Sequence, residues 1–159
     1  MLEDGSVYEG TARGDFKETA CEIVFNTSMT GYVEILTDPS YAGQGVVMTY
    51  PMIGNYGISR EDFESERLQP SAFIVHELSS DPSNFRCTDT IENLLKEYNI
   101  PCISGVDTRA VVKKLRESGT MRGVLTSDIG DRERLMDVIK SFRQIDLVGS
   151  VTAKQTKVY

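Results

Sequence analysis

Residues 71–76 are Ser71-Ala72-Phe73-Ile74-Val75-His76, a short and nearly continuous apolar run. A run of this length and composition is typical of a strand buried on both faces of a sheet. An amphipathic helix is predicted to follow, because Ile91, Leu94, Leu95 and Tyr98 recur at i, i+3, i+4 and i+7. A buried strand followed by such a helix indicates an α/β chain from this point onward.

The same alternation continues to residue 142. Residues 101–104 and 123–126 are predicted strands, and a helix between them begins at Asp107 as a cap and ends at Gly119. Basic residues lie near the negative end of that helix, namely Lys113, Lys114 and Arg116. A final helix carries its apolar side chains at Leu135, Val138, Ile139 and Phe142. Strand–helix alternation of this kind predicts a parallel βαβ sheet with right-handed crossovers.

The first half is predicted to be β-rich and antiparallel. Residues 22–26 and 45–50 are rich in β-branched and aromatic side chains, which favour strands. An Asp-Gly turn at residues 4–5 predicts a hairpin whose returning strand is residues 7–10. Its partner strand is nearly missing, because only Met1 and Leu2 precede the turn, so we expect a marginal edge there. Both halves should share one layered core in a single domain over residues 1–152.

Composition excludes several classes of partner. The chain has 159 residues, of which 40% are apolar, and this is enough to bury a core. A net charge of −7 with 17 Lys and Arg is a poor match for nucleic acid or anionic lipid. No apolar run approaches the roughly 18–20 residues that span a bilayer, and residues 1–5 are acidic where a signal peptide is basic. We expect a cytoplasmic protein that binds neither nucleic acid nor membrane.

No complete active site can be assembled from the reactive side chains. A cysteine nucleophile needs a nearby base, and the single histidine, His76, lies inside a predicted buried strand. Cys21, Cys87 and Cys102 lack paired spacing and are most simply reduced, structural thiols. One histidine without a Cys-x-x-Cys pair leaves no zinc ligand set, and a phosphate loop is absent from the sequence. The residues therefore predict no catalytic group and no metal site.

Several segments nevertheless resemble one family. Residues 25–41, Phe-Asn-Thr-Ser-Met-Thr-Gly-Tyr-Val-Glu-Ile-Leu-Thr-Asp-Pro-Ser-Tyr, are similar to the signature stretch of carbamoyl phosphate synthase small chains. Thr-Tyr-Pro-Met-Ile-Gly-Asn-Tyr-Gly at 49–57, Ser-Asn-Phe-Arg at 83–86, Gly-Val-Asp-Thr-Arg at 105–109 and Leu-Arg-Glu-x-Gly at 115–119 follow in order. A resemblance that spans nearly the whole chain is far more specific than a lone motif.

The resemblance implies that this chain is one domain of a larger enzyme. Small chains of this family join such an N-terminal domain to a class I glutamine amidotransferase domain, whose Cys–His–Glu set releases ammonia from glutamine. Ammonia then passes to a large chain, where ATP and magnesium are expected and where bicarbonate is converted to carbamoyl phosphate for arginine and pyrimidine biosynthesis. No cofactor is expected in the present domain. The implied fold is a three-layer swivelling β/β/α domain, and residues 153–159 would begin the linker to the amidotransferase domain.

One ligand position carries over from the family. The serine of Thr-Asp-Pro-Ser is Ser40, and the resemblance implies that it contacts glutamine. A hydroxyl on a turn stiffened by proline can both donate and accept a hydrogen bond. The alternative is that Ser40 only satisfies the backbone of its own turn. Structural roles in turns, strand packing and caps are expected instead for Asn26, Tyr32, Glu34, Asp38 and Arg109.

Two functional hypotheses follow. The first is a non-catalytic domain of a glutamine-hydrolysing ligase that docks the large chain and helps to form the glutamine site and ammonia passage. The second is a stand-alone adaptor or regulatory module that reuses the fold. A reading frame that continues into Gly-x-Cys-x-Gly and a later His-x-Glu would favour the ligase domain. A stop codon after Tyr159 would favour the stand-alone module. Large-chain sequence further downstream would indicate a fused, single-chain synthase.

Overall fold

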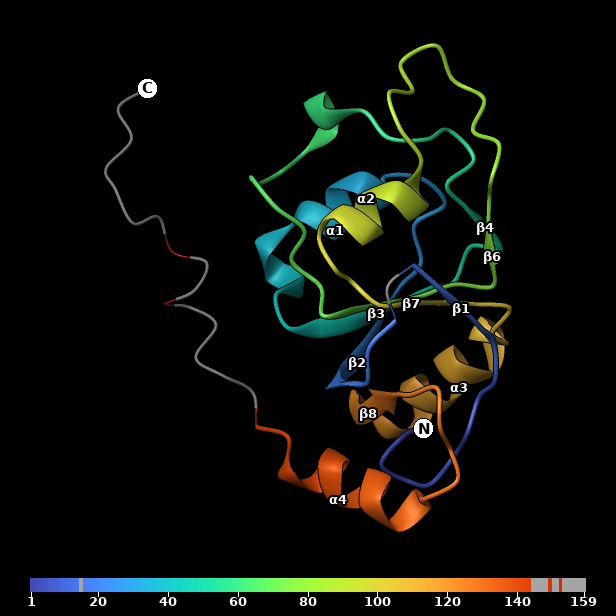
Figure 1. Ribbon diagram of the computed structural model, residues 1–159, viewed down its shortest axis with the longest axis vertical. Helices are drawn as coiled ribbons and strands as arrows, with labels where there is room; N and C mark the ends of the chain where they lie inside the picture. Colours follow the sequence, from blue (N-terminus) through green and yellow to red (C-terminus); the bar gives the residue numbers. More distant parts are fainter. Residues whose placement is uncertain (15, 144–148, 150–151, 153–159) are drawn as a thin grey trace.

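The computed structural model describes residues 1–14, 16–143, 149 and 152 (Figure 1). Its strands and α-helices are, in chain order, β1 (Thr11–Arg13), β2 (Thr19–Asn26), α1 (Tyr32–Thr37), β3 (Gln44–Met48), β4 (Met52–Ile53), β5 (Ala72–Ile74), β6 (Glu77–Leu78), α2 (Ile91–Glu97), β7 (Cys102–Ser104), α3 (Thr108–Ser118), β8 (Met121–Leu125) and α4 (Arg132–Ser141). Short 3-10 helices form at Pro39–Tyr41 and Arg60–Asp62. The predicted linker at residues 153–159 lies outside the described residues, so the domain boundary stays a prediction.

A six-stranded mixed sheet forms the centre, in the order β1-β7-β5-β3-β2-β8. Its four inner strands pair in parallel, whereas β1 pairs antiparallel with β7 at one edge and β8 pairs antiparallel with β2 at the other. A second, two-stranded sheet joins β4 to β6 in parallel beside it. The carboxyl ends of β3, β5 and β7 therefore lie along one edge of the central sheet.

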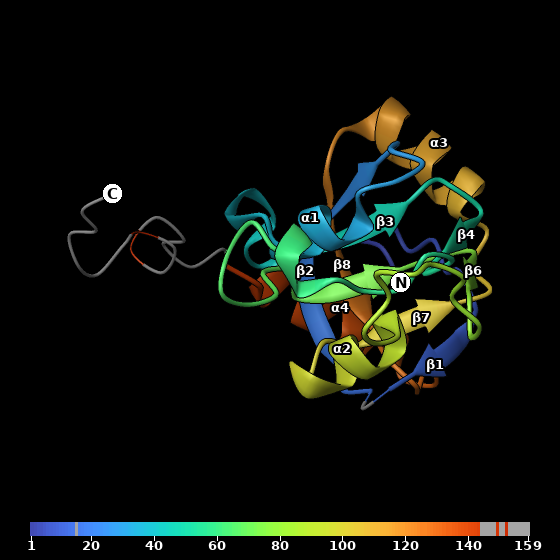
Figure 2. The same ribbon diagram turned by 90° about the horizontal axis from the view of Figure 1, so that it is seen from above.

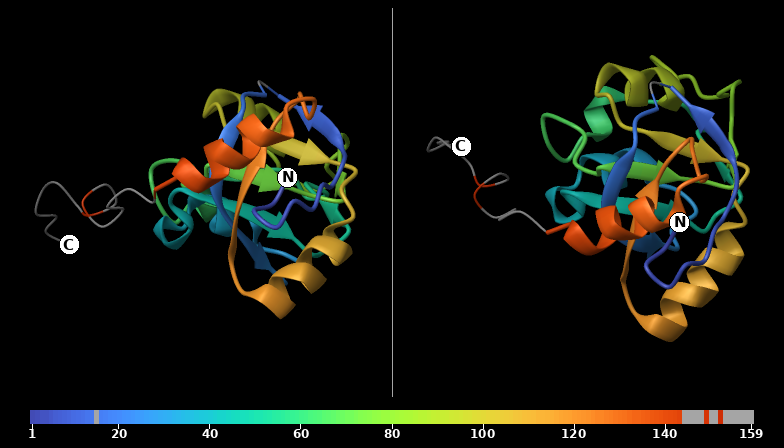
Figure 3. Two further views of the ribbon diagram at one scale, coloured as in Figure 1. Left: turned by 90° about the horizontal axis from the view of Figure 1, so that it is seen from below. Right: turned by 60° about the horizontal axis from the view of Figure 1, so that its bottom comes forward.

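Helices cover both faces of the sheet. Helices α1 and α2 lie over one face, where Tyr32, Leu36 and Leu94 pack with Phe73 of β5 (Figures 1 and 2). Helix α3 and the N-terminal segment lie on the other face with α4, as the view from below shows (Figure 3). The α/β class and the layered arrangement are confirmed, and the strands and helices predicted for residues 71–142 are all present. The parallel βαβ arrangement predicted for them holds from β5 through α2 to β7. It is wrong for β8, which lies at the edge of the sheet away from β7 and pairs antiparallel with β2.

One detail of the predicted first half differs. Strands β2 and β3 pair in parallel, with Glu22 opposite Gln44 and Asn26 opposite Met48, rather than antiparallel. Parallel neighbours need a crossover of about a dozen residues or more. Residues 27–43 supply that crossover, and they contain a helix, α1, where turns were expected. A helix of six residues, three of them β-branched (Val33, Ile35 and Thr37), gives little helical signal in the sequence. The tertiary contacts of α1 therefore decide its conformation.

The predicted returning strand at residues 7–10 is also absent. The turn itself is present, since Gly5 N donates to Leu2 O at 2.9 Å and Leu2 N donates to Ser6 O at 2.9 Å. Met1 pairs with β8, because its amine donates to Val124 O and its carbonyl accepts from Val124 N, both at 2.9 Å. The chain after the turn therefore crosses the face of the sheet and becomes a strand only at β1.

Helix caps follow the sequence with one shift. Asp107 caps α3 as predicted, with its Oδ1 accepting from Ala110 N at 2.9 Å. Gly119 ends that helix with a φ of 85°, in the region that favours glycine. The spacing of Asp89 and Glu92 is that of a capping box and would place the cap of α2 at Asp89. The helix is instead capped by Thr90, whose Oγ1 accepts from Asn93 N at 3.2 Å. The Asp89 carboxylate instead accepts from Thr90 N, which fixes the residue that makes the cap.

Candidate functional site

Ser40 lies on a corner immediately after α1, in the 3-10 helix Pro39–Tyr41. Asp38 caps this short helix, because its Oδ1 accepts from Ser40 N at 2.8 Å. The corner is tied on both sides, since Asp38 N donates to Glu34 O at 2.8 Å and Tyr41 N donates to Asp38 O at 3.1 Å. The Ser40 side chain is exposed, and its hydroxyl makes no hydrogen bond to any part of the chain that the structure describes. The backbone of the turn is thus satisfied by Asp38, which leaves the hydroxyl available.

Helix α1 is held at its start by Tyr56. The Tyr56 hydroxyl accepts from Gly31 N at 2.6 Å and from Tyr32 N at 3.2 Å, two donors that a helix start leaves without an intrahelical partner. Tyr32 returns the contact, because its ring stacks on Tyr56 with centroids 4.2 Å apart and its hydroxyl donates to Gly57 O at 2.8 Å. Burial raises the pKa of both phenols, so both remain neutral donors and acceptors. The pair fixes α1 and therefore the corner that carries Ser40.

Four further hydrogen bonds hold the chain on either side of this corner. Asn26, the last residue of β2, donates from Nδ2 to the Tyr41 hydroxyl at 2.8 Å. Its Oδ1 accepts from Ser28 N at 2.7 Å. At the other end of α1, Thr37 is buried, and its Oγ1 donates to Val33 O at 2.8 Å and accepts from Glu64 N at 2.9 Å. The segment from β2 to Tyr41 is therefore bonded to itself and to the following loop.

The reactive side chains do not gather into one site. Cys21 and Cys102 are fully buried, and burial raises the pKa of each thiol to about 12. Cys87 is half-buried, with its thiol donating to Asp89 O at 3.3 Å. The expectation that His76 is buried is wrong: β5 ends at Ile74, and His76 is exposed with Nδ1 3.1 Å from Val106 O. Over the described ranges, no group of three His, Cys, Asp or Glu side chains could hold a metal ion.

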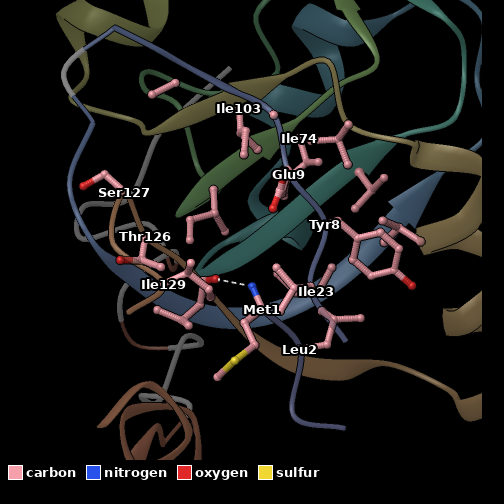
Figure 4. Close-up of a pocket in the computed structure, with 18 of the residues that line it drawn as sticks. Met1, Leu2, Tyr8, Glu9, Ile23, Ile74, Ile103, Thr126, Ser127 and Ile129 are labelled. Atoms are coloured by element: carbon pink, nitrogen blue, oxygen red, sulfur yellow. Dashed lines mark hydrogen bonds between the residues drawn. The ribbon is translucent and has the colours of Figure 1, made fainter. Parts of the chain in front are cut away.

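An apolar cavity of about 420 Å³ opens on the sheet face opposite α1 and α2 (Figure 4). Its floor consists of inward-facing side chains of the central strands, Ile23, Ile74 and Ile103 among them. The N-terminal segment forms one wall, so that Met1 and Tyr8 border the space. Ser40 lines neither this cavity nor the two other hollows described for the surface. Among the helices of the described residues, none is long and apolar enough to cross a membrane.

Sequence reasoning missed two features of these surfaces. The first is the role of the Tyr56 hydroxyl at the start of α1, for which the sequence gave no prediction. The second is the exposure of Lys113 and Arg116, which were assigned to the negative end of α3 and in fact line a groove. Helical spacing could have indicated the second, because the two side chains share one face of α3. Nothing in the sequence predicts which backbone amides Tyr56 meets.

The sequence matches a known family. A model described as the carbamoyl-phosphate synthase small chain, CPSase domain, matches residues 1–125. The chain belongs to this carbamoyl-phosphate synthase small chain family. The matched residues of the small chain domain include the Ser40 corner, the Tyr32–Tyr56 pair and all of α3.

Relatives in the family extend the match to nearly the whole chain. The carbamoyl phosphate synthase small chain of Archaeoglobus fulgidus is 50% identical over 161 residues, which cover 98% of this chain and 44% of that protein. The same protein from Caldanaerobacter subterraneus subsp. tengcongensis is 49% identical over 154 residues, covering 97% of this chain and 41% of the relative. In Fusobacterium nucleatum the identity is 54% over 127 residues, 80% of this chain and 36% of the relative. The chain thus spans less than half the length of these small chains.

Proposed function

We propose that this chain is the N-terminal domain of the small, glutamine-using chain of a carbamoyl phosphate synthase. In that role it docks the large chain and helps to form the glutamine site and the ammonia passage. The observation that carries the proposal is the identity of about half over 97–98% of this chain, set against 41–44% coverage of the relatives. A domain that covers less than half of the small chain needs the remainder of that chain for glutamine hydrolysis.

The chemistry is divided among the parts of the holoenzyme, a carbon–nitrogen ligase. We assign glutamine hydrolysis to a class I amidotransferase domain with a Cys–His–Glu set, joined through a linker from about residue 153. We assign ATP, magnesium and the conversion of bicarbonate to carbamoyl phosphate to the large chain, in the cytoplasm. The present domain helps to position glutamine and to shield the ammonia passage, and its own residues form no covalent bond to the reacting atoms. Buried thiols at Cys21 and Cys102, with pKa values of about 12, are poor nucleophiles and agree with that assignment.

Ser40 is the residue through which we propose that the domain touches glutamine. Its hydroxyl is exposed and free of hydrogen bonds among the described residues, on a corner that Asp38 and Pro39 hold rigid. A preorganised hydroxyl loses little conformational entropy on binding. It can donate to the α-carboxylate of glutamine or accept from its α-ammonium group. Ser40 borders none of the three hollows described here, which fits a site completed by a second domain.

The test uses the complete small chain with its large chain. Ser40→Ala should raise the KM for glutamine roughly tenfold, the loss expected for one hydrogen bond to a charged group. Carbamoyl phosphate synthesis from added ammonia should be unchanged, because ammonia bypasses the glutamine site. Ser80→Ala, at another exposed serine, is the matched control and should leave both activities unchanged.

Two results would contradict the proposal. An unchanged KM for glutamine in Ser40→Ala would remove Ser40 from the glutamine site. Ammonia release from glutamine by the 159-residue chain alone would show that the domain is itself a glutaminase. The docking role is tested by co-purification of the small chain with a cognate large chain, and failure to form that complex would exclude it.

A further inference from the structure

A long groove runs beside α3 at the carboxyl ends of three parallel strands. Thr49 and Pro51 follow β3, His76 follows β5, and Arg109 lies in the first turn of α3 after β7. The hollow has a volume of about 1070 Å³ and is separate from the Ser40 corner and from the apolar cavity. Clefts outside the carboxyl ends of parallel strands are a usual place for ligands and partners in α/β folds.

Three cations line the groove along one face of α3. Arg109, Lys113 and Arg116 follow the spacing i, i+4 and i+7, which places them on the same side of a helix. All three are exposed, and none has an ion pair within the part of the chain that the structure describes. Lys114, on the neighbouring face, is paired with Asp4 at 3.0 Å. An unpaired basic row is notable in a chain whose net charge is −7.

The other charged and polar groups of the groove leave it basic. Asp107 uses its carboxylate to cap α3 through Ala110 N, at 2.9 Å. His76 Nδ1 lies 3.1 Å from Val106 O, and because a carbonyl only accepts, Nδ1 carries the proton. Glu117 is the remaining acidic residue of the lining, and it adjoins Arg116 in the last turn of α3. The lining therefore contains three cations and two carboxylates, and the carboxylate of Asp107 already accepts a hydrogen bond at the start of α3.

The spread of the charges selects the kind of occupant. With a rise of about 1.5 Å per residue, the row from Arg109 to Arg116 extends over roughly 10 Å along the helix axis. A small anion needs donors that converge to within about 3 Å of the same atoms, and a row along an exposed helix does not converge. A helix or strand that presents several carboxylates in succession matches such a row.

We propose that this groove is a docking surface for an acidic segment of the large chain, whose carboxylates pair with Arg109, Lys113 and Arg116. The inference rests on the proposed function, which supplies the large chain as the partner. Charge pairs at the rim of an interface act mainly on the association rate and on the dependence of binding on salt. Three such pairs together contribute about tenfold or more to affinity.

The experiment compares two variants of the complete small chain that lose the same charge. The groove variant is Arg109→Gln, Lys113→Gln, Arg116→Gln. The control variant removes three exposed cations elsewhere that have no ion pair among the described residues: Lys17→Gln, Arg132→Gln, Lys140→Gln. The Kd for the large chain is measured by biolayer interferometry at low and at high NaCl, and thermal melts report whether each variant is folded.

We expect the groove variant to bind the large chain about tenfold or more weakly than wild type, mainly through slower association, and the control to bind as wild type does. The wild-type Kd should rise with salt more steeply than that of the groove variant. Wild-type affinity for the groove variant would overturn the inference and leave the proposed docking intact. A wild-type Kd that is insensitive to salt would overturn it even if the variant misfolds.

Two more outcomes separate the inference from its alternatives. If the wild-type small chain does not bind the large chain at all, the proposed function fails, and the inference fails with it. If citrate binds the wild type but not the groove variant, while both bind the large chain equally, the groove is a small-anion site and the docking proposal is wrong.

Discussion

Replacing Tyr56 by Phe tests how the Ser40 corner is held. The change removes one hydroxyl and keeps the ring, so the stack on Tyr32 at 4.2 Å is retained. The hydroxyl accepts hydrogen bonds from Gly31 N at 2.6 Å and from Tyr32 N at 3.2 Å, and both are lost. Both amides are at the start of α1, where no carbonyl of the helix can replace the acceptor.

The expected loss follows from those two amides. A buried donor without a partner costs about 1–3 kcal/mol. Gly31 is only partly buried and the second bond is long, so we expect a total of about 2 kcal/mol. For a chain of this size, 1 kcal/mol corresponds to about 2–4 °C in Tm. The free energy of unfolding should therefore fall by about 2 kcal/mol and the Tm by about 4–8 °C.

Urea unfolding followed by circular dichroism measures the change, and Tyr50→Phe serves as the control. Tyr50 packs partly buried against the same core, and its hydroxyl makes no hydrogen bond among the described residues. Amide hydrogen exchange should also quicken at Gly31 and Tyr32 in the Tyr56 variant and stay unchanged in the control. A Tyr56→Phe protein within about 0.5 kcal/mol of Tyr50→Phe would refute the capping argument.

Three further predictions concern other parts of the chain. The Arg134 guanidinium, on α4, lowers the pKa of Glu18 from 4.5 to about 2. The difference in unfolding free energy between wild type and Glu18→Gln should therefore be largest above pH 4.5 and disappear as the pH falls towards 2, which unfolding measured across this pH range would show. Iodoacetamide at mildly alkaline pH should label Cys87 in the native protein and spare Cys21 and Cys102, whose thiol pKa values are about 12; mass spectrometry of the digested protein would detect any label there. A short apolar extension before Met1 should raise the Tm by filling the adjoining 420 Å³ cavity, and an unchanged Tm would show that added residues do not pack there.

Much of the fold could be predicted locally. The apolar run at 71–76 and the helical spacing of Ile91, Leu94 and Leu95 indicated a strand and a helix, and both formed. Asp107 could be identified as a cap from its position before an amphipathic stretch, because capping depends on residues only three positions apart. These features depend on neighbours in the chain, so the sequence contains the whole signal.

The first half of the fold was harder to predict, because its elements depend on contacts between residues far apart in the chain. Helix α1 has six residues and starts from a left-handed glycine, Gly31, with a φ of 80°. Its stability comes from the Tyr56 hydroxyl and from burial of Tyr32 and Leu36 against the sheet, contacts that no local pattern reports. Without α1, the crossover between β2 and β3 was invisible, and their parallel pairing was predicted as antiparallel.

The sequence by itself determined the α/β class, the strands and helices of the second half and the family. Through the contiguous motif Thr-Asp-Pro-Ser, it also singled out Ser40 as the residue that we propose to contact glutamine. Only the tertiary structure decided that Asp38 accepts from the Ser40 amide while the Ser40 hydroxyl makes no hydrogen bond among the described residues. It also decided that Arg109, Lys113 and Arg116 border one groove with His76. The physical reason is distance along the chain: patterns report contacts within a few residues, whereas these surfaces join segments that only the packed sheet brings together.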